Sequence, residues 1–302
     1  MLQSTVTLSR TSKDLLTFRM YPNPLMSPAI NVDPMPATVS TLALDTQPQP
    51  IEIAARLFGR FSVTLNGNGV FQCNSCAGWS MLAYLLAHNR AAVPVDLLED
   101  IFWPDADTHA ARNNRNVAMS HLRMALRSST SQAVIEHRSG KYQFVEVCQL
   151  RTDVQEFEQR LNAGHWMESN HRSDEAINHY EAALSLYEDD FLVDELYQDW
   201  VLRKRDTLRT AYVDTLDRLS KLYFGRHNYA ACIEAGRRIL SRDRWREDVH
   251  CLLMRCYIQQ NQLCFAFKQY RDCVEALRQE FNMTPSVETV QLHAQMLRRD
   301  AV

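Results

Sequence analysis

The stretch HAARNNRNVAMSHLRMALRSS, residues 109–129, decides how this sequence is best interpreted. It holds four arginines, three asparagines and two histidines, and no acidic residue occurs from Thr108 to Ile135. The chain as a whole nevertheless has a formal net charge of −3. A basic helix without acids on an acidic protein is the pattern expected when one face meets a polyanion.

A helical wheel separates this stretch into two faces. The apolar face gathers Ala111, Ala118, Met119, Leu122 and Leu126. The opposite face carries Asn113, Asn116, Ser120, Arg123 and Arg127, with Arg112 at its edge. Arginine forks suit guanine edges and phosphates, and asparagine can read adenine through two hydrogen bonds. A helix face that is only exposed to solvent normally carries charges of both signs, whereas this face carries positive charges alone. This difference favours contact with nucleic acid over simple exposure to solvent. Arg115 falls inside the apolar face, and we expect it to reach solvent at the helix edge.

The elements before this helix follow the order of a winged helix-turn-helix with an added N-terminal sheet. Residues 56–67 alternate in hydrophobicity and predict a strand or hairpin, and residues 67–73 add a turn and a second short strand. Apolar residues at helical spacing predict two helices, at 79–89 and 93–103. The basic stretch is then the third helix, which in this fold is the recognition helix.

A hairpin is expected directly after the basic helix. Residues 133–145 contain two short runs of strand-forming residues around Ser139 and Gly140, a pair that favours a tight turn. Arg138 and Lys141 flank this turn. The hairpin corresponds to the wing, and its two cations are candidates for contact with the DNA backbone.

Composition divides the chain into three segments. Residues 1–53 hold seven of the ten prolines and no glycine, so they predict a disordered arm. Residues 54–150 form the predicted winged-helix domain and carry a net charge of +2. Residues 151–302 carry a net charge of −4.

The last segment is helical throughout by its hydrophobic spacing. Three similar stretches each begin with an alanine, namely Ala176, Ala231 and Ala266, and the last two are 35 residues apart. That spacing is close to the ~34 residues of a tetratricopeptide repeat. A long helix is expected near residues 199–224, with further helix starts at Asp243 and at Pro285-Ser286. The sequence thus predicts a mainly α protein with a small β component, in which a winged helix is followed by a tetratricopeptide-like helical repeat.

Several function classes are disfavoured. No apolar run approaches the ~18 residues of a membrane helix, and the N-terminus lacks a signal peptide, so we expect a cytoplasmic protein without membrane contact. Cys73 and Cys76 form one C-x-x-C, but a structural zinc site needs four ligands, and a redox exchange motif is equally disfavoured. No phosphate-binding or nucleophile motif is present. We therefore expect no metal, no cofactor and no enzymatic activity.

The motifs resemble a known family of bacterial regulators. VPVDLLEDIFWPDADTHAARNNRNVAMSHLRMAL and SGKYQFV resemble the OmpR-type winged helix of the SARP-type activators. DVQEFEQRL, YEDDFL, QYRDCVEALRQEF and PSVET resemble the bacterial transcriptional activator domain of that family, which has a tetratricopeptide-like fold. The resemblance implies roles in DNA recognition for Arg112, Asn113, Asn114, Ser120 and Arg123. Arg115, His121 and Met124 depart from the family pattern.

The resemblance implies a sequence-specific, DNA-binding transcriptional activator that recruits RNA polymerase. Its double-stranded DNA site is expected to be a direct repeat, on which two copies of the chain sit head to tail as a homodimer. The alternative hypothesis is a helical-repeat adaptor or ligand sensor whose winged helix binds DNA weakly or not at all. The three departures favour this alternative, whereas the acid-free face favours DNA binding.

Overall fold

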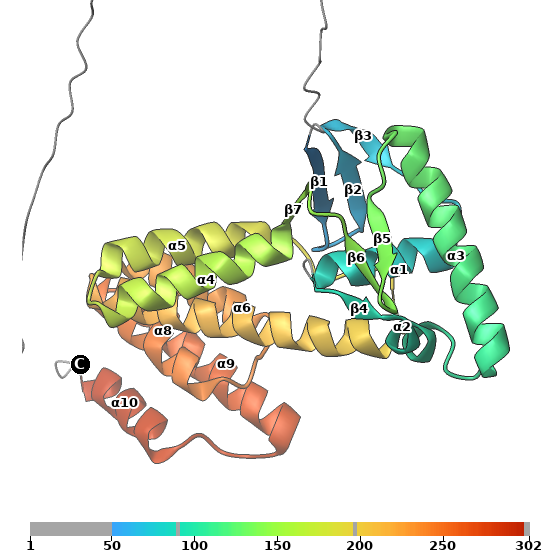
Figure 1. Cartoon of the computed structure of the whole chain (residues 1–302). Coiled ribbons are helices and arrows are strands. Elements are labelled where there is room, and N and C mark those ends of the chain that lie inside the picture. The colour runs from blue at the N-terminus through green and yellow to red at the C-terminus, as the bar shows by residue number, and fades with distance from the viewer. Residues whose placement is uncertain (1–49, 89–90, 196–197, 299–302) are drawn as a thin grey trace, which may run out of the picture. The chain divides into compact units, whose positions relative to one another are not determined.

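The computed structural model describes residues 50–88, 91–195 and 198–298. In these residues two small sheets and three helices come first, and seven further helices follow from Asp153 onward (Figure 1). The expected mainly α fold class is confirmed. The proline-rich arm predicted for residues 1–53 lies outside the described residues up to residue 49.

The first sheet joins the beginning of the described chain to its middle. β1 (Ile51–Arg56) pairs antiparallel with β2 (Ser62–Leu65), which pairs with β3 (Asn68–Phe71). β7 (Cys148–Thr152) lies parallel to β1 on its other side, so the strand order is β3-β2-β1-β7. The folded part therefore begins before the predicted start at Ala54. Alternate side chains of β1, starting at its first residue, are buried in the core, and this burial holds the earlier residues in the sheet.

Three helices belong to this half of the chain. α1 (Cys76–Ala87) begins three residues before its expected start, because the hydroxyl of Ser75 caps it by accepting the N–H of Gly78. α2 (Val95–Phe102) and α3 (Thr108–Ser129) match the predicted second and third helices. Of the three, α1 and α3 contact the first sheet.

The predicted wing is confirmed as a hairpin of β5 (Ile135–Arg138) and β6 (Lys141–Phe144). The two residues between the strands, Ser139 and Gly140, have φ of 51° and 72°. Positive φ at both central residues suits a two-residue hairpin turn, because its twist matches that of the strands. β4 (Val93–Pro94) adds a third strand beside β6.

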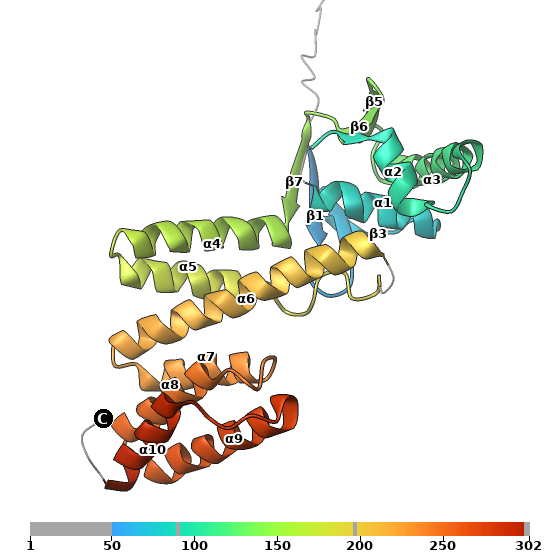
Figure 2. The same cartoon turned by 90° about the horizontal axis from the view of Figure 1, so that it is seen from below.

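The second half is a stack of helices. Its elements are α4 (Asp153–Ser169), α5 (Ser173–Leu186), α6 (Asp199–Gly225), α7 (Tyr229–Leu240), α8 (Glu247–Gln259), α9 (Leu263–Phe281) and α10 (Val287–Arg298). From α4 to α9 each helix packs against the next one along the chain, as a helical repeat requires (Figure 2). The expected helix start at Asp243 is wrong. Asp243 lies in a turn, where its carbonyl accepts the N–H of Arg246, and α8 begins only afterwards.

The boundary predicted between residues 150 and 151 lies within β7. The carboxylate of Asp153, just after this strand, accepts the backbone N–H groups of Leu57 and Phe58 at 2.8–2.9 Å. The ring of Phe58 in turn lies 5.3 Å from that of Phe157. The winged helix and the helical half therefore share one continuous core.

Candidate nucleic-acid interface

α3 is capped at its N-terminus and packs closely on α1. The side chain of Asp107 caps it by accepting the N–H groups of His109 and Ala110, both at 2.9 Å. Gly78 on α1 allows close approach, since a Cβ there would lie 2.9 Å from the carbonyl oxygen of Ala118. α3 thus packs closely on α1, and its opposite side is left open.

The apolar face predicted for α3 is confirmed. The residues of this face that lie in the core are Ala111, Ala118, Met119, Leu122 and Leu126. Burying them fixes the rotation of the helix about its axis, and this rotation decides which polar side chains point outward.

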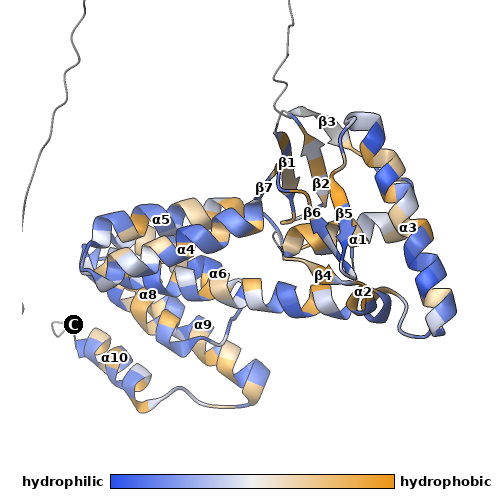
Figure 3. Cartoon of the chain, viewed as in Figure 1, coloured by the Kyte–Doolittle hydropathy of each residue, from blue (hydrophilic) through white to orange (hydrophobic). Residues whose placement is uncertain are grey.

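Most of the predicted contact residues on α3 are exposed. They are Arg112, Asn113, Asn114, Asn116, Ser120 and Arg127. Among the described residues, neither Arg112 nor Arg127 forms an ion pair. Hydrophilic residues recur along this helix (Figure 3). The outward side of α3 therefore presents hydrogen-bonding groups, and its positive charge has no acidic partner in the part of the chain that the structure describes.

Arg115 lies elsewhere than predicted. It is 7% exposed rather than extended to the helix edge, and its Nη1 lies 3.0 Å from Oε1 of Glu99 on α2. Its Nη2 also donates to the side-chain oxygen of Asn116 at 2.9 Å. Residue 115 therefore belongs to the packing of α2 against α3. Its departure from the family pattern is matched by a buried acid, because a guanidinium in the core needs a partner charge.

Two apolar residues on the open side of α3 were missed by the sequence reasoning. Val117 is 48% exposed and Met124 is 65% exposed. Both fall on the wheel among Asn113, Ser120 and Arg127, so the exposed face has an apolar centre. Apolar side chains on a recognition helix can contact the methyl group of thymine. The signal was present in the sequence, because the wheel places both residues opposite the apolar face.

Arg123 is less free than predicted. It is half-buried, with its guanidinium 5.6 Å from the centroid of the Tyr142 ring on β6. Its Nη2 also lies 3.4 Å from the carbonyl oxygen of Ile135 on β5. Arg123 therefore joins the recognition helix to the wing, and its position beside the wing was not readable from the helix alone.

The wing tip carries two exposed cations that face each other. Arg138 and Lys141 are directly opposite in the register of β5 and β6. Like charges in this position destabilise a hairpin. An anion bound at the tip would relieve this repulsion, which makes the pair a stronger signal than either residue alone.

The described residues add no metal ligands to the C-x-x-C motif. Cys73 and Cys76 are free thiols, and within the described ranges no three His, Cys, Asp or Glu residues form a group able to hold a metal. None of the described helices is both long and apolar enough to cross a membrane.

Comparison with known families identifies the second half of the chain. Residues 152–297 match the family model described as the bacterial transcriptional activator domain. This half is a bacterial transcriptional activator domain. With a winged helix in front of it, the chain has the architecture of the SARP-type bacterial transcriptional activators, and the resemblance found in the sequence is confirmed. The match begins at Thr152, the last residue of β7 and one residue after the domain start predicted from the sequence.

A solved structure of EmbR from Mycobacterium tuberculosis, in complex with a low-affinity phosphopeptide, has the same fold. The match has a TM-score of 0.67 at 20% identity and covers 83% of this chain, which spans 66% of the length of that protein. The fold thus extends through both halves.

Two tetratricopeptide-repeat domains are also similar over part of the chain. The Sgt2 domain from Aspergillus fumigatus is 14% identical, with a TM-score of 0.33, over 48% of this chain and 78% of that one. The Arabidopsis OM64 domain is 9% identical, with a TM-score of 0.34, over 49% of this chain and 98% of that one. No curated protein sequence matches this chain significantly.

Proposed function

We propose that this member of the activator family binds double-stranded DNA in a sequence-specific manner. In this proposal α3 enters the major groove and the β5–β6 wing contacts the adjacent backbone. The observation that carries the proposal is the combined surface of α3 and the wing tip. It presents Arg112, Arg127, Arg138 and Lys141, all exposed and without an ion pair in the described part of the chain.

The residues of this surface divide by the contacts they can make. Asn113, Asn116 and Ser120 face outward from the middle of α3 and suit base edges, beside the apolar Val117 and Met124. The cations at the ends of α3 and on the wing suit phosphates, and Asn114 lies at the margin of the face. Hydrogen bonds from the asparagines and the serine to base edges, together with apolar contacts to thymine methyl groups, would give the specificity. The contacts of the cations with phosphates would give most of the affinity.

We propose that the helical half serves activation rather than DNA contact. Its net charge of −4 disfavours approach to phosphate, and a helical stack offers surfaces for a protein partner such as RNA polymerase. Two copies on a direct repeat would lie about one DNA turn apart, roughly 10–11 base pairs. The chain would act as a regulator without a catalytic step.

The test starts with selection of bound DNA from a random pool by the full chain. The affinity for the selected site is then measured against salt concentration, for the native chain and for the double variant Arg112→Gln/Arg127→Gln. If both arginines contact phosphates, the slope of log affinity against log salt falls by about two in the variant, since each contact contributes ~0.9.

The matched control is Arg203→Gln/Lys221→Gln on α6, which removes the same charge from two exposed positions of the helical half. We expect its affinity and salt slope to equal those of the native chain. Equal losses in both double variants would mean that only net charge matters. Absence of salt-dependent binding in the folded native chain would favour the adaptor or sensor hypothesis.

A further inference from the structure

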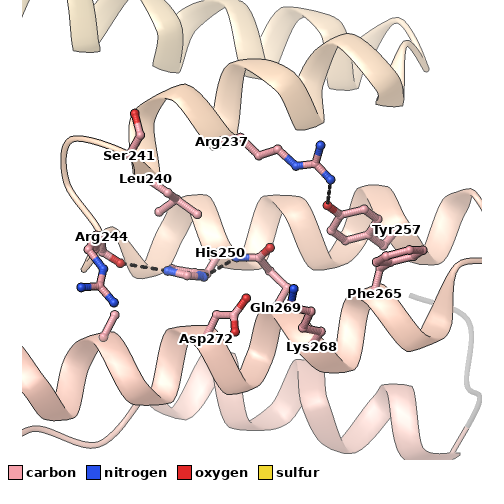
Figure 4. Close-up of a pocket in the computed structure, with 11 residues that line it drawn as sticks. Arg237, Leu240, Ser241, Arg244, His250, Tyr257, Phe265, Lys268, Gln269 and Asp272 are labelled. Atoms are coloured by element: carbon pink, nitrogen blue, oxygen red, sulfur yellow. Dashed lines mark hydrogen bonds between the residues drawn. The ribbon is translucent and has the colours of Figure 1, made fainter.

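A cavity of about 420 Å³ opens in the helical half, away from the proposed DNA surface. It lies between α7, α8 and α9, and its wall is made by side chains from all three helices and from the turn between α7 and α8 (Figure 4). Binding sites for small molecules typically have volumes of about 300–1,000 Å³, and this cavity lies within that range.

The charge of the cavity is opposite to that of the domain around it. Arg237 from α7, Arg244 from the turn and Lys268 from α9 line it, and the one acidic lining residue is Asp272. None of the three cations forms an ion pair with any described residue. In a domain with a net charge of −4, the cavity is a local positive site that would attract an anion.

One wall of the cavity is polar and held together by hydrogen bonds. His250 is 3% exposed; its Nε2 donates to the carbonyl oxygen of Arg244 at 3.0 Å, and its Nδ1 accepts the side-chain amide of Gln269 at 2.6 Å. Burial lowers the pKa of His250, which favours the neutral imidazole. It joins the side chain of Gln269 on α9 to the Arg244 backbone in the turn before α8 (Figure 4).

The other wall is aromatic. The rings of Tyr257 and Phe265 are stacked, with centroids 5.7 Å apart, and Phe265 is 53% exposed. Arg237 donates to the hydroxyl of Tyr257 at 3.0 Å, which fixes the direction of this ring. Leu240 and Ala276 complete the apolar lining. A flat apolar group would therefore be buried at this wall while its charged end faces the cations.

We propose that this cavity binds a small organic anion, with a carboxylate or phosphate held by Arg244 and Lys268 and a flat apolar body packed along Phe265 and Tyr257. Arg237 adds to the attraction from the aromatic side. The proposal does not depend on DNA binding, because no residue of the cavity belongs to α3 or the wing. It gives the helical half a ligand that the family assignment does not supply.

Isothermal titration of the full chain tests the proposal with four probes. Phenyl phosphate and benzoate carry both the anion and the ring, inorganic phosphate carries only the anion, and phenol carries only the ring. We expect saturable, competitive binding of phenyl phosphate, benzoate or both, tighter than phosphate or phenol alone. The tighter of the two identifies the charged group. Failure of both to bind saturably, or binding no tighter than that of phosphate and phenol, overturns the proposal.

Variants locate the site. Arg244→Gln/Lys268→Gln should weaken binding of the better probe by about ten-fold or more, because two charge-assisted contacts are lost. Arg255→Gln/Arg271→Gln removes two exposed arginines from α8 and α9 outside the cavity and should leave binding unchanged. Equal effects of the two pairs, in chains that retain the native circular dichroism, overturn the assignment.

Asp272→Asn provides a test by gain rather than loss. Removing the one carboxylate from the lining should tighten anion binding by a few-fold and leave phenol binding unchanged. A gain cannot result from misfolding, so an unchanged or weaker affinity for the anionic probes in this variant counts against the proposal.

Discussion

α3 and α6 are both rich in cationic residues, yet the two helices use them differently. On α6 the cations mostly have partners within the protein. The Nζ atom of Lys204 lies 2.7 Å from Oε1 of Glu158, and Nη1 of Arg218 lies 3.0 Å from Oε2 of Glu168. The Nζ atom of Lys221 lies 2.6 Å from Oδ2 of Asp217, one turn earlier on the same helix. On α3 the one arginine with an acidic partner among the described residues is the buried Arg115.

Some arginines on α6 hold the fold without any acid. The guanidinium of Arg205 donates to the carbonyl oxygens of Phe191 and Leu192 at 2.8 and 2.6 Å. It also reaches the carbonyl oxygen of Glu195 at 3.3 Å. The comparison teaches that the number of arginines on a helix does not indicate binding. What matters is whether each guanidinium is already satisfied by the protein.

The largest effect is expected for Glu99→Ala, which leaves the Arg115 guanidinium buried without its partner charge. The free energy of unfolding should fall by about 3–5 kcal/mol, measured by urea denaturation. Replacing both residues by leucine should restore most of this loss, because the pair is then exchanged for apolar packing. A loss below about 1 kcal/mol in the single variant would mean that Arg115 is solvated, as its neighbours on α3 are.

Arg205→Met should lower the free energy of unfolding by about 2 kcal/mol, because part-buried carbonyl groups lose their donor while the apolar stem is kept. Affinity for the selected DNA should not change. A loss of DNA binding without loss of stability would contradict the division of roles between α3 and α6.

Arg123→Ala is expected to act through the wing. DNA affinity should fall by about 1 kcal/mol, roughly five-fold, because the contact with Tyr142 no longer positions the hairpin. The loss should be less than additive with that of Arg138→Gln at the wing tip, which gel-shift titrations of both single variants and the double variant measure. Full additivity would indicate that Arg123 contacts DNA on its own.

The smallest effect is expected for Lys221→Gln. Its pair with Asp217 is on the surface, with 66% of the lysine side chain exposed, and such pairs contribute only about 0.3–0.5 kcal/mol. The urea midpoint of unfolding should change by no more than the experimental scatter. The small difference between the variant and the native chain should disappear at high salt, which screens the pair. A loss above 1 kcal/mol would show that surface pairing on α6 matters more than the comparison implies.

Much of the winged helix could be predicted because its signals are local. The spacing of Leu122 and Leu126 with the alanines of α3 sets the buried face, and the Ser139-Gly140 pair sets the wing turn. The open face follows from the same wheel, so most candidate contact residues were found in the sequence. The position of Arg123 beside the wing did not follow from the wheel, because its neighbour Tyr142 comes from the hairpin.

The partner of Arg115 was not predictable with the same certainty. An arginine on an apolar face requires either an exit to solvent or a buried acid, and the sequence allows both. Glu99 sits on α2 next to apolar residues, yet only the packing of α2 against α3 brings its carboxylate to the guanidinium. A buried acid one helix upstream is the signal to look for when an arginine interrupts an apolar face.

By itself the sequence determined the order of the elements, the faces of α3 and the helical character of the second half, since each depends on periodicity and turn residues within a short stretch. The tertiary structure alone decided how the halves join. The parallel pairing of β1 with β7, the Asp153 contacts and the edge-to-face contact of Tyr84 with Trp200 bring together residues far apart in the chain. Such contacts leave no local pattern, because each side is equally compatible with many apolar partners until the fold selects one.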